Sequence, residues 1–237
     1  MKNPTIFRCV LAGLALSLPA LGQSAKCLDA SAESHHQVLY ESQGARVLLL
    51  DLPRIASTQP YCYARPYLFV VTGAGKSSST PEGSATYSHD WNGPEARFIY
   101  TPLKHVLRNE SMVPFRAVIV ETFHQVDYDP MQGNYDVDLF PSDFGSVKPT
   151  WTVSFTRGTI GASKTQLAPG DSTSVVGTNS YHLLIALTEV SLAKESPGGV
   201  VEQLQLGTQE VRMLPPGPAF QLSNEASQPA RFVMIEF

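Results

Sequence analysis

Hydrophobic residues in this chain occur in short runs that are separated by turn-forming residues. In the first half, the runs that predict strands cover residues 46–52, 61–71, 96–100, 106–108 and 115–122. Gly, Pro, Asp, Asn and Ser lie between them, and no stretch has the three-to-four-residue spacing of an amphipathic helix. Many short strands with such turns predict an all-β protein, built from closed or double-sheet units of about 90 residues.

The chain contains an internal repeat with an offset of 115 residues. Over residues 93–122, nine of the thirty positions are identical to the residue 115 places further on. Average residue usage would give about two identities in such a stretch. The identical pairs are Glu95/Glu210, Arg97/Arg212, Leu107/Leu222, Asn109/Asn224, Glu110/Glu225, Pro114/Pro229, Arg116/Arg231, Val118/Val233 and Glu121/Glu236. The sequence therefore predicts a tandem duplication.

The repeat divides the chain into two units with a linker between them. We expect a first unit over residues 23–123, which includes an N-terminal tail, and a second unit over residues 151–237. Residues 124–150 are rich in Asp, Gly, Pro and Tyr and are expected to form a long linker.

The first 22 residues have the features of a secretory signal peptide. Lys2 and Arg8 precede an apolar run over residues 9–21, which is too short for a comfortable membrane span. Small residues favour cleavage after Gly22, with Ala25 as the second choice. No later apolar run reaches spanning length, so we expect a secreted or periplasmic protein without a membrane span.

Export decides how the cysteines are interpreted. Cys9 would be removed with the signal peptide, which leaves Cys27 and Cys62 as a pair in a compartment where disulfides persist. We predict that the two are bonded, which in the chain-entropy model contributes about 3–4 kcal/mol of stability. Two unpaired buried thiols are the alternative.

Composition and charge narrow the function classes. With 43% hydrophobic and 16% charged residues, the chain is neither disordered nor collagen-like. It carries 17 basic and 21 acidic residues, a net charge of −4, so a broad basic surface for nucleic acid is not expected. Residues 70–77 imitate a phosphate-binding loop, but Val70 stands where the first Gly of that motif belongs.

The end of each repeat resembles the cupin family, in which a PxG turn precedes a ligand His and, further on, an Asn. Residues 215–217 lead to Phe220 and Asn224, and in the first copy residues 100–105 lead to Asn109. The final strand of each copy, over residues 114–121 and 229–237, and the segment Leu167-Ala168-Pro169-Gly170 also resemble parts of the family pattern. The resemblance implies a bicupin, that is, tandem double-stranded β-helix (jelly-roll) barrels, each with a central pocket.

The cupin metal site consists of two His, a carboxylate and a third His, a set that suits divalent transition metals. In the first copy, the resemblance places these positions at Tyr61, Tyr63, Tyr67 and His105. In the second copy, they fall on Val176, Thr178, His182 and Phe220. One His in each copy cannot hold a metal, so we expect neither a metal nor a cofactor. A ferric-phenolate site on the tyrosines is the alternative, although tyrosine is a poor ligand at neutral pH.

The resemblance also predicts which way the side chains point in the first barrel. Alternate residues of a strand share a face. If Tyr61 and Tyr63 point into the barrel, Cys62 therefore points outward, where it can meet Cys27. The candidate ligand-binding residues of this barrel are Tyr61, Tyr63, Tyr67 and His105. They would either line a pocket, as aromatic residues with polar tips often do, or simply fill the barrel.

The second copy is expected to offer less to a ligand. Val176 and Phe220 form an apolar set that resembles core filling. His182 is therefore only a secondary candidate for ligand binding, with few polar residues around it. Any small-molecule site is therefore predicted in the first copy.

Three functions remain open on the sequence alone. We favour a metal-free protein that binds a small molecule. The alternatives are a structural or partner-binding module with filled barrels, and a metal-independent enzyme that uses His105 and the tyrosines. No catalytic residue is assigned. The pair His35-His36 lacks further spaced metal ligands, and His89 and His124 have no partner at an informative spacing.

Overall fold

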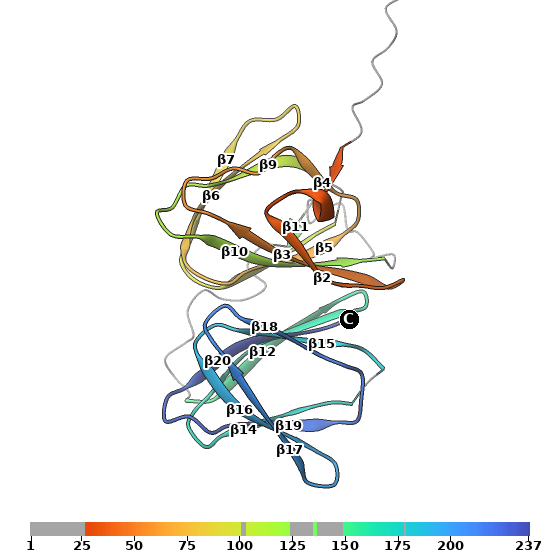
Figure 1. The fold of residues 1–237 in the computed structure, drawn as a ribbon, viewed down its shortest axis with the longest axis vertical. Helices are drawn as coiled ribbons and strands as arrows, with labels where there is room; N and C mark the ends of the chain where they lie inside the picture. The colour runs from red at the N-terminus through yellow and green to blue at the C-terminus, as the bar shows by residue number, and fades with distance from the viewer. Residues whose placement is uncertain (1–26, 101–102, 124–134, 137–148, 178) are drawn as a thin grey trace, which may run out of the picture.

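Each half of the chain forms a barrel in which two sheets face each other (Figure 1). The computed structural model describes residues 27–100, 103–123, 135–136, 149–177 and 179–237. The predicted signal peptide and most of the predicted linker lie outside these residues, as do Cys9, His124 and Thr178. The limits of both segments therefore stay predictions.

The strands of the first barrel are β1 (Leu28–Asp29), β2 (His36–Glu41), β3 (Ala45–Leu52), β4 (Tyr61–Tyr63), β5 (Tyr67–Val71), β6 (Gly75–Pro81), β7 (Tyr87–Trp91), β8 (Glu95–Ile99), β9 (Leu103–Asn109), β10 (Phe115–Thr122) and β11 (Tyr135–Asp136). A short 3-10 turn, η1 (Ala30–Ala32), follows β1. One sheet has the order β11-β8-β5-β10-β3-β2 and the other the order β1-β4-β9-β6-β7.

The strands of the second barrel are β12 (Trp151–Arg157), β13 (Ile160–Leu167), β14 (Ser172–Val175), β15 (His182–Ala186), β16 (Val190–Ser196), β17 (Val200–Leu206), β18 (Val211–Leu214), β19 (Phe220–Asn224) and β20 (Ala230–Glu236). Its sheets have the orders β12-β13-β20-β15-β18 and β14-β19-β16-β17. The predicted all-β fold with tandem jelly-roll barrels is confirmed. Within the described part of the chain, no helix has the length and apolar character of a membrane span.

The structure confirms the sequence repeat strand by strand. A shift of 115 residues takes β5 onto β15 and β6 onto β16 with the same bounds. It also preserves register, because Leu52 opposes Phe115 between β3 and β10, and Leu167 opposes Ala230 between β13 and β20. The two barrels therefore share one topology and most of their pairing register. The exception is β14, in which Val175 lies opposite Phe220, whereas in the first barrel Tyr61, the equivalent of Val176, lies opposite His105.

The apolar run of β10 is continuous because this strand is buried on both faces. Phe115, Ala117 and Ile119 point into the first barrel and belong to its core. Val118 and Val120 point the other way, into a second cluster between the barrels. A strand covered on both faces loses the alternation of apolar and polar residues that a half-exposed strand shows.

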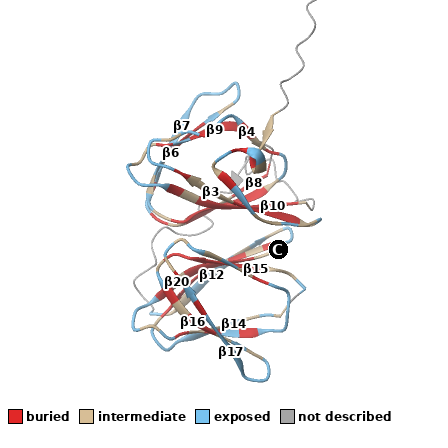
Figure 2. Cartoon of the chain, viewed as in Figure 1, coloured by how far each residue is buried: buried red, intermediate tan, exposed pale blue. Residues whose placement is uncertain are grey.

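The two barrels are joined through this shared apolar layer. Figure 2 shows buried residues along the strands with which the barrels face each other. Equivalent positions contribute from both sides: the fully or almost fully buried members include the pairs Leu68/Leu183, Val70/Ile185, Val118/Val233 and Val120/Ile235. Lys164 is also completely buried, and its ammonium group donates a hydrogen bond to the carbonyl of Pro94 at 3.2 Å.

A disulfide ties the N-terminal segment to the first barrel. Cys27 and Cys62 are bonded, with 5.9 Å between their Cα atoms, as predicted. The neighbouring strands β1 and β4 pair in parallel, with Leu28 opposite Tyr61. Tyr61 and Tyr63 lie in the barrel core while Cys62 is half-buried, so the predicted alternation of β4 is confirmed.

The Asn that ends each copy's motif has a structural role. Asn224 donates hydrogen bonds from its amide to the carbonyls of Leu167 (3.0 Å) and Gln228 (2.9 Å), and its carbonyl oxygen accepts from the backbone N–H of Ala226 (3.0 Å). Asn109 makes the equivalent contacts in the first barrel, to Leu52, Pro53, Val113 and Ser111. Both side chains are buried and connect the turn before the last strand to the opposite sheet.

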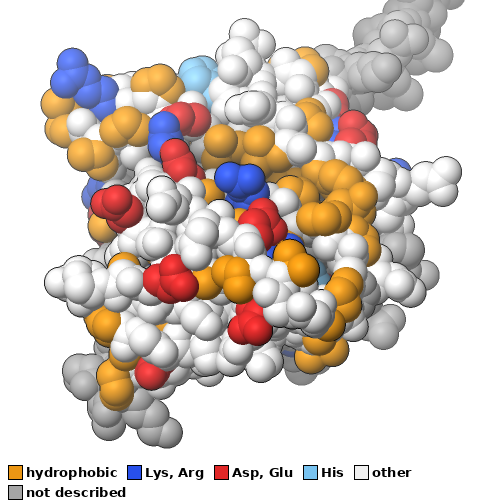
Figure 3. Space-filling model, turned by 60° about the horizontal axis from the view of Figure 1, so that its bottom comes forward, with side chains coloured by type: hydrophobic (Ala, Val, Ile, Leu, Met, Phe, Trp, Pro, Cys, Tyr) orange, Lys and Arg blue, Asp and Glu red, His pale blue; other side chains and the backbone are white. Residues whose placement is uncertain are grey.

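The charged residues are mixed on the surface. On the face drawn in Figure 3, Lys and Arg side chains are scattered among acidic ones, and apolar side chains gather between them. The described salt bridges include pairs on this kind of exposed surface, such as Lys194 with Glu202 at 3.0 Å. Exposed pairs of this type contribute little to stability.

Candidate functional site

The structure brings together the four residues that the alignment placed at the first barrel's centre. Tyr61 and Tyr63 come from β4, Tyr67 from the start of β5, and His105 from β9, where it lies opposite Tyr61. The ring centroids of Tyr61 and His105 are 4.7 Å apart, and those of Tyr63 and Tyr67 are 4.1 Å apart. Only Tyr67 and His105 line a cavity, whereas Tyr61 and Tyr63 are fully buried in the core beside it.

A buried hydrogen-bond network occupies the hydroxyl of Tyr63. The carboxylate of Glu33 accepts a hydrogen bond from His36 Nδ1 at 2.8 Å. The other ring nitrogen of His36, Nε2, lies 3.0 Å from the Tyr63 hydroxyl and accepts a hydrogen bond from it, since a neutral His with a protonated Nδ1 has a free lone pair only at Nε2. Tyr61 in turn donates to Tyr63 at 3.5 Å. The Tyr63 hydroxyl therefore has its hydrogen-bond partners within the protein.

The sequence did not reveal this network. His36 and Glu33 are both buried. His36 begins β2, and the equivalent strand of the second copy, β12, begins with Trp151, so the repeat gives no sign of a His at this place. The signal available was the spacing of three residues between Glu33 and the adjacent His35-His36. That spacing shows that the side chains can meet, but not that they are enclosed.

Burial sets the protonation of the central residues. It raises the pKa of the Tyr63 and Tyr67 hydroxyls well above their usual value, and that of Tyr61 as well. Desolvation, together with the nearby His36, lowers the pKa of His105 to about 4. At neutral pH this cluster therefore consists of three phenols and a neutral imidazole.

These residues do not fit the metal of the cupin family. A phenol must lose its proton to bind a metal strongly, and burial opposes that loss here. One nitrogen of His105 is already 2.7 Å from the Ser79 hydroxyl. No three His, Cys, Asp or Glu side chains gather as a metal site among the described residues. The metal-free state stays a prediction.

The cavity beside this cluster has a volume of about 550 Å³. Its walls come from β5, β6, β7, β8 and β9, the strands that the two sheets bring together at one side of the barrel. Aromatic side chains cover much of the wall, and the polar side chains face it mainly from β6 and β7. The lining residues include Tyr67, Phe69, Trp91, His89, Arg97 and His105.

Arg97 contacts three side chains at the cavity wall. Its guanidinium lies over the Trp91 ring, 4.6 Å from the centroid, and an Nη atom lies 2.7 Å from His89 Nε2 and 3.7 Å from the Glu95 carboxylate. The Trp91 indole N–H donates to Ser77 at 2.9 Å. The Nε of Arg97 is buried and has no hydrogen-bond partner among the described residues.

His105, which lines the same cavity, also has a buried atom without a partner. With Nδ1 on Ser79, its buried Nε2 has no partner among the described residues. Burying a polar atom without a partner costs free energy, so such atoms are rare and need an explanation. Two of them, Arg97 Nε and His105 Nε2, belong to residues that line one cavity. The sequence predicted His105 but not Arg97.

The lowered pKa of His105 predicts an acid-sensitive fold. The unfolded chain takes up a proton near pH 6.5, whereas folded His105 does so only near pH 4. Stability is therefore fully present above pH 6.5 and falls as the pH drops toward 4, by up to about 3 kcal/mol from this group. Burial also lowers the pKa of His36 and His182, which adds to the trend. Urea unfolding at a series of pH values should show a shallower slope for His105→Gln, and an unchanged slope would contradict this account.

The second barrel differs from the sequence-based expectation. Phe220 is buried in the core as predicted, but Val176 is 74% exposed and lies at the rim of a cavity of about 360 Å³. His182 is buried and lines that cavity. The expectation that these positions fill the barrel is therefore wrong for Val176.

No protein-family model matches this chain, and no curated protein matches it in sequence. Solved structures match in three dimensions. AerE from Microcystis aeruginosa has a TM-score of 0.61 at 10% identity, covering 85% of this chain and 90% of its own. A variant of salicylate 1,2-dioxygenase from Pseudoaminobacter salicylatoxidans, in complex with gentisate, gives 0.59 at 10% identity, with 90% and 76% covered. Procruciferin, an 11S globulin from Brassica napus, gives 0.57 at 10% identity, with 82% and 76% covered.

Similarity at these identities shows the fold alone. The neighbours are cupin-fold proteins, and the match runs over both barrels of this chain. The repeated sheet order and register within the chain are consistent with that match. The chain therefore has the bicupin fold, two tandem cupin-type barrels.

Proposed function

We propose that this protein binds a small organic acid with an apolar or aromatic body in the cavity of the first barrel, without a metal. The observation that carries the proposal is the pair of unpartnered buried atoms, Arg97 Nε and His105 Nε2, on residues of one aromatic-lined cavity. A carboxylate accepts hydrogen bonds from Arg with good geometry, and neutral His105 can donate or accept one. Trp91 and Phe69 offer apolar surface for the rest of the ligand.

The size and the wall of the cavity suit this class of ligand. Small-ligand sites typically enclose about 300–1,000 Å³, with mostly apolar walls and a few placed polar groups. Gentisate, the ligand bound in one of the structural neighbours, is a small aromatic acid. The cavity also weighs against the alternative of a filled first barrel. For an enzyme based on His105 and the tyrosines, only Tyr67 would reach the same cavity.

We further propose that the protein works outside the cytoplasm. The Cys27–Cys62 disulfide supports this, because disulfides persist in oxidising compartments. Native mass spectrometry of protein isolated from its own compartment would show a co-purifying acid, and elemental analysis would test the metal-free state. About one Fe, Mn, Ni or Zn ion per chain that is lost on His105→Ala would overturn that part of the proposal.

Arg97→Met should weaken binding of a small aromatic acid by about 5- to 150-fold, which corresponds to losing roughly 1–3 kcal/mol from a desolvated polar contact. Salicylate and gentisate serve as probes, and quenching of Trp91 fluorescence reports binding, since Trp91 lines the cavity.

The repeat supplies a matched control for this experiment. Arg212 is the equivalent of Arg97 in the second copy, and it is exposed and lies outside the described cavities. Arg212→Met should leave binding unchanged. An acid that binds equally well to the Arg97→Met and His105→Ala variants would show that this cavity is not the site.

A further inference from the structure

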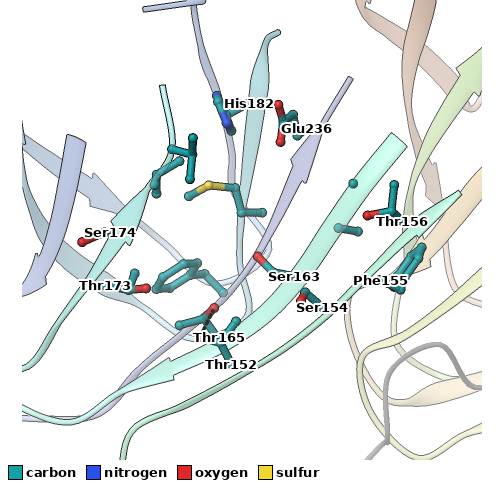
Figure 4. Close-up of a pocket in the computed structure, with 16 residues that line it drawn as sticks. Thr152, Ser154, Phe155, Thr156, Ser163, Thr165, Thr173, Ser174, His182 and Glu236 are labelled. Atoms are coloured by element: carbon teal, nitrogen blue, oxygen red, sulfur yellow. Dashed lines mark hydrogen bonds between the residues drawn. The ribbon is translucent and has the colours of Figure 1, made fainter. Parts of the chain in front are cut away.

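The second barrel contains a cavity whose chemistry differs from that of the first. Figure 4 shows this cavity, which has a volume of about 360 Å³ and lies between β12, β13, β14, β15 and β20. Hydroxyl groups dominate its wall. The labelled Ser and Thr side chains come from the paired strands β12 and β13 and from β14 of the facing sheet, where Thr173 points toward the cavity and its neighbour Ser174 points to the other side. The lining residues include Ser154, Ser163, Thr165, Thr173, His182 and Glu236.

Strand pairing explains how the hydroxyls are gathered. On β12, Thr152 and Ser154 share a face because they are two residues apart. Thr152 lies opposite Thr165 of β13, and Ser154 lies opposite Ser163. The hydroxyls of Thr152 and Thr165 are 3.0 Å apart. Two rows of hydroxyls therefore stand side by side on the inner face of the barrel.

A comparison of the two copies shows that this fold does not need hydroxyl side chains at these positions. Shifting Ser163 and Thr165 back by 115 residues leads to Leu48 and Leu50, which are fully buried in the core of the first barrel. The same two places inside an equivalent barrel thus hold apolar side chains in one copy and hydroxyls in the other. Thr165 is buried, whereas Thr152 and Ser154 are exposed at the cavity's open side. A buried hydroxyl is costly unless it has a hydrogen-bond partner, which for Thr165 is the Thr152 hydroxyl.

One end of the cavity carries two titratable groups. His182 and Glu236 lie opposite each other on β15 and β20, and Figure 4 shows them side by side. His182 is only 4% exposed, and its buried Nδ1 has no hydrogen-bond partner among the described residues. Desolvation lowers its pKa despite Glu236, so the imidazole is neutral at pH 7.

The charge of the wall limits the class of ligand. Neither Lys nor Arg is among the side chains that line this cavity in the described part of the chain, whereas Glu236 contributes a negative charge. Anions are therefore disfavoured. Many hydroxyls, a neutral imidazole and a carboxylate form hydrogen bonds with ligand hydroxyl groups, as donors and as acceptors. Phe232 and Met234 supply an apolar base for the C–H face of such a ligand.

We propose that the cavity of the second barrel is a binding site for a neutral polyhydroxylated molecule of about monosaccharide size. Its volume lies in the range of small-ligand sites, about 300–1,000 Å³. The two barrels would then bind different classes of molecule, an acid in the first and a polyol in the second. This site does not depend on the first-barrel proposal, because the cavities share no lining residue.

Calorimetric titration and saturation-transfer NMR with D-glucose, D-galactose, D-mannose and myo-inositol test the proposal. At least one of the four should bind, and D-glucuronate should bind more weakly than its neutral counterpart, because Glu236 repels its carboxylate. Thr165→Val, which keeps the shape and removes the hydroxyl, should weaken the bound polyol by about tenfold. Ser163→Leu, which restores the first-copy residue, should abolish binding.

Thr208→Val is the matched control, since Thr208 is exposed and does not line the cavity. It should leave polyol binding unchanged, and so should Arg97→Met, which separates this site from the first-barrel site. Circular dichroism establishes that each variant is folded. The proposal fails if none of the four polyols binds, if glucuronate binds as tightly as glucose, or if binding survives both Thr165→Val and Ser163→Leu.

Discussion

Ile185→Asp should reduce the free energy of unfolding by at least about 5 kcal/mol and leave much of the protein unfolded at ambient temperature. Ile185 is fully buried in the apolar layer between the barrels. The substitution removes a large apolar side chain, which alone costs about 2–5 kcal/mol, and places a carboxyl group where no charge is paired. The free energy of unfolding of a typical domain is only about 5–15 kcal/mol. Urea unfolding followed by circular dichroism measures the change.

The exposed position Val200 is the control for this substitution. Val200 lies on the outermost strand of its sheet, β17, and is 67% exposed. Val200→Asp should change stability by no more than about 0.5 kcal/mol. If Ile185→Asp were as harmless as Val200→Asp, the barrels would not share a buried layer in solution.

Asn224→Ala should lower the free energy of unfolding by about 2–4 kcal/mol. The side chain satisfies two backbone carbonyls and one backbone N–H, and its removal leaves groups near the barrel wall without partners. Each buried group left unpaired costs about 1–3 kcal/mol, and water can reach some of them. The equivalent Asn109→Ala should have a similar effect, because Asn109 makes the same set of contacts in the first barrel.

Gln228→Ala distinguishes this role from a general effect on the turn. Asn224 bonds to the backbone carbonyl of Gln228, so the exposed Gln228 side chain is not part of the contact. Its truncation should leave stability nearly unchanged in the same urea titration. A loss of less than about 1 kcal/mol in Asn224→Ala would mean that the turn does not depend on this side chain.

The architecture could be predicted because the same pattern of strands occurs in both copies of the repeat. One offset relates β5 to β15 and β10 to β20, and strands that recur at a fixed spacing must occupy equivalent places. Alternation within β4 was equally informative, since Tyr61 and Tyr63 point inward while Cys62 meets Cys27 outside. The layer between the barrels could not be predicted, because a strand buried on both faces has the same apolar pattern whatever covers it.

The candidate site was only partly accessible to sequence reasoning. The alignment located Tyr61, Tyr63, Tyr67 and His105, and the structure brings them together. It could not tell which of them reach a cavity, because that depends on packing with residues from other strands. The hydroxyl of Tyr63 is hydrogen-bonded to His36, whose counterpart in the second copy is Trp151.

The hydroxyl-lined cavity of the second barrel was missed for a different reason. Alternating Ser and Thr on a strand usually mark the solvent-facing side of a sheet, as at an exposed β-surface. Only the register of β12 against β13, together with the buried position of Thr165, shows that this row faces inward. A comparison with Leu48 and Leu50 in the first copy would have given the same answer from the sequence.

The layer between the barrels also resembles a contact between two identical subunits. Leu68 and Leu183 lie in it together, as do Val70 and Ile185, so each barrel contributes the same positions. A contact in which both partners use the same patch is the kind made by two identical subunits about a two-fold axis. A half-length chain with this patch would be expected to pair with a second copy of itself in the same way. In the tandem chain the barrel interiors differ, as Leu48 and Ser163 show, while the layer between the barrels is apolar on both sides.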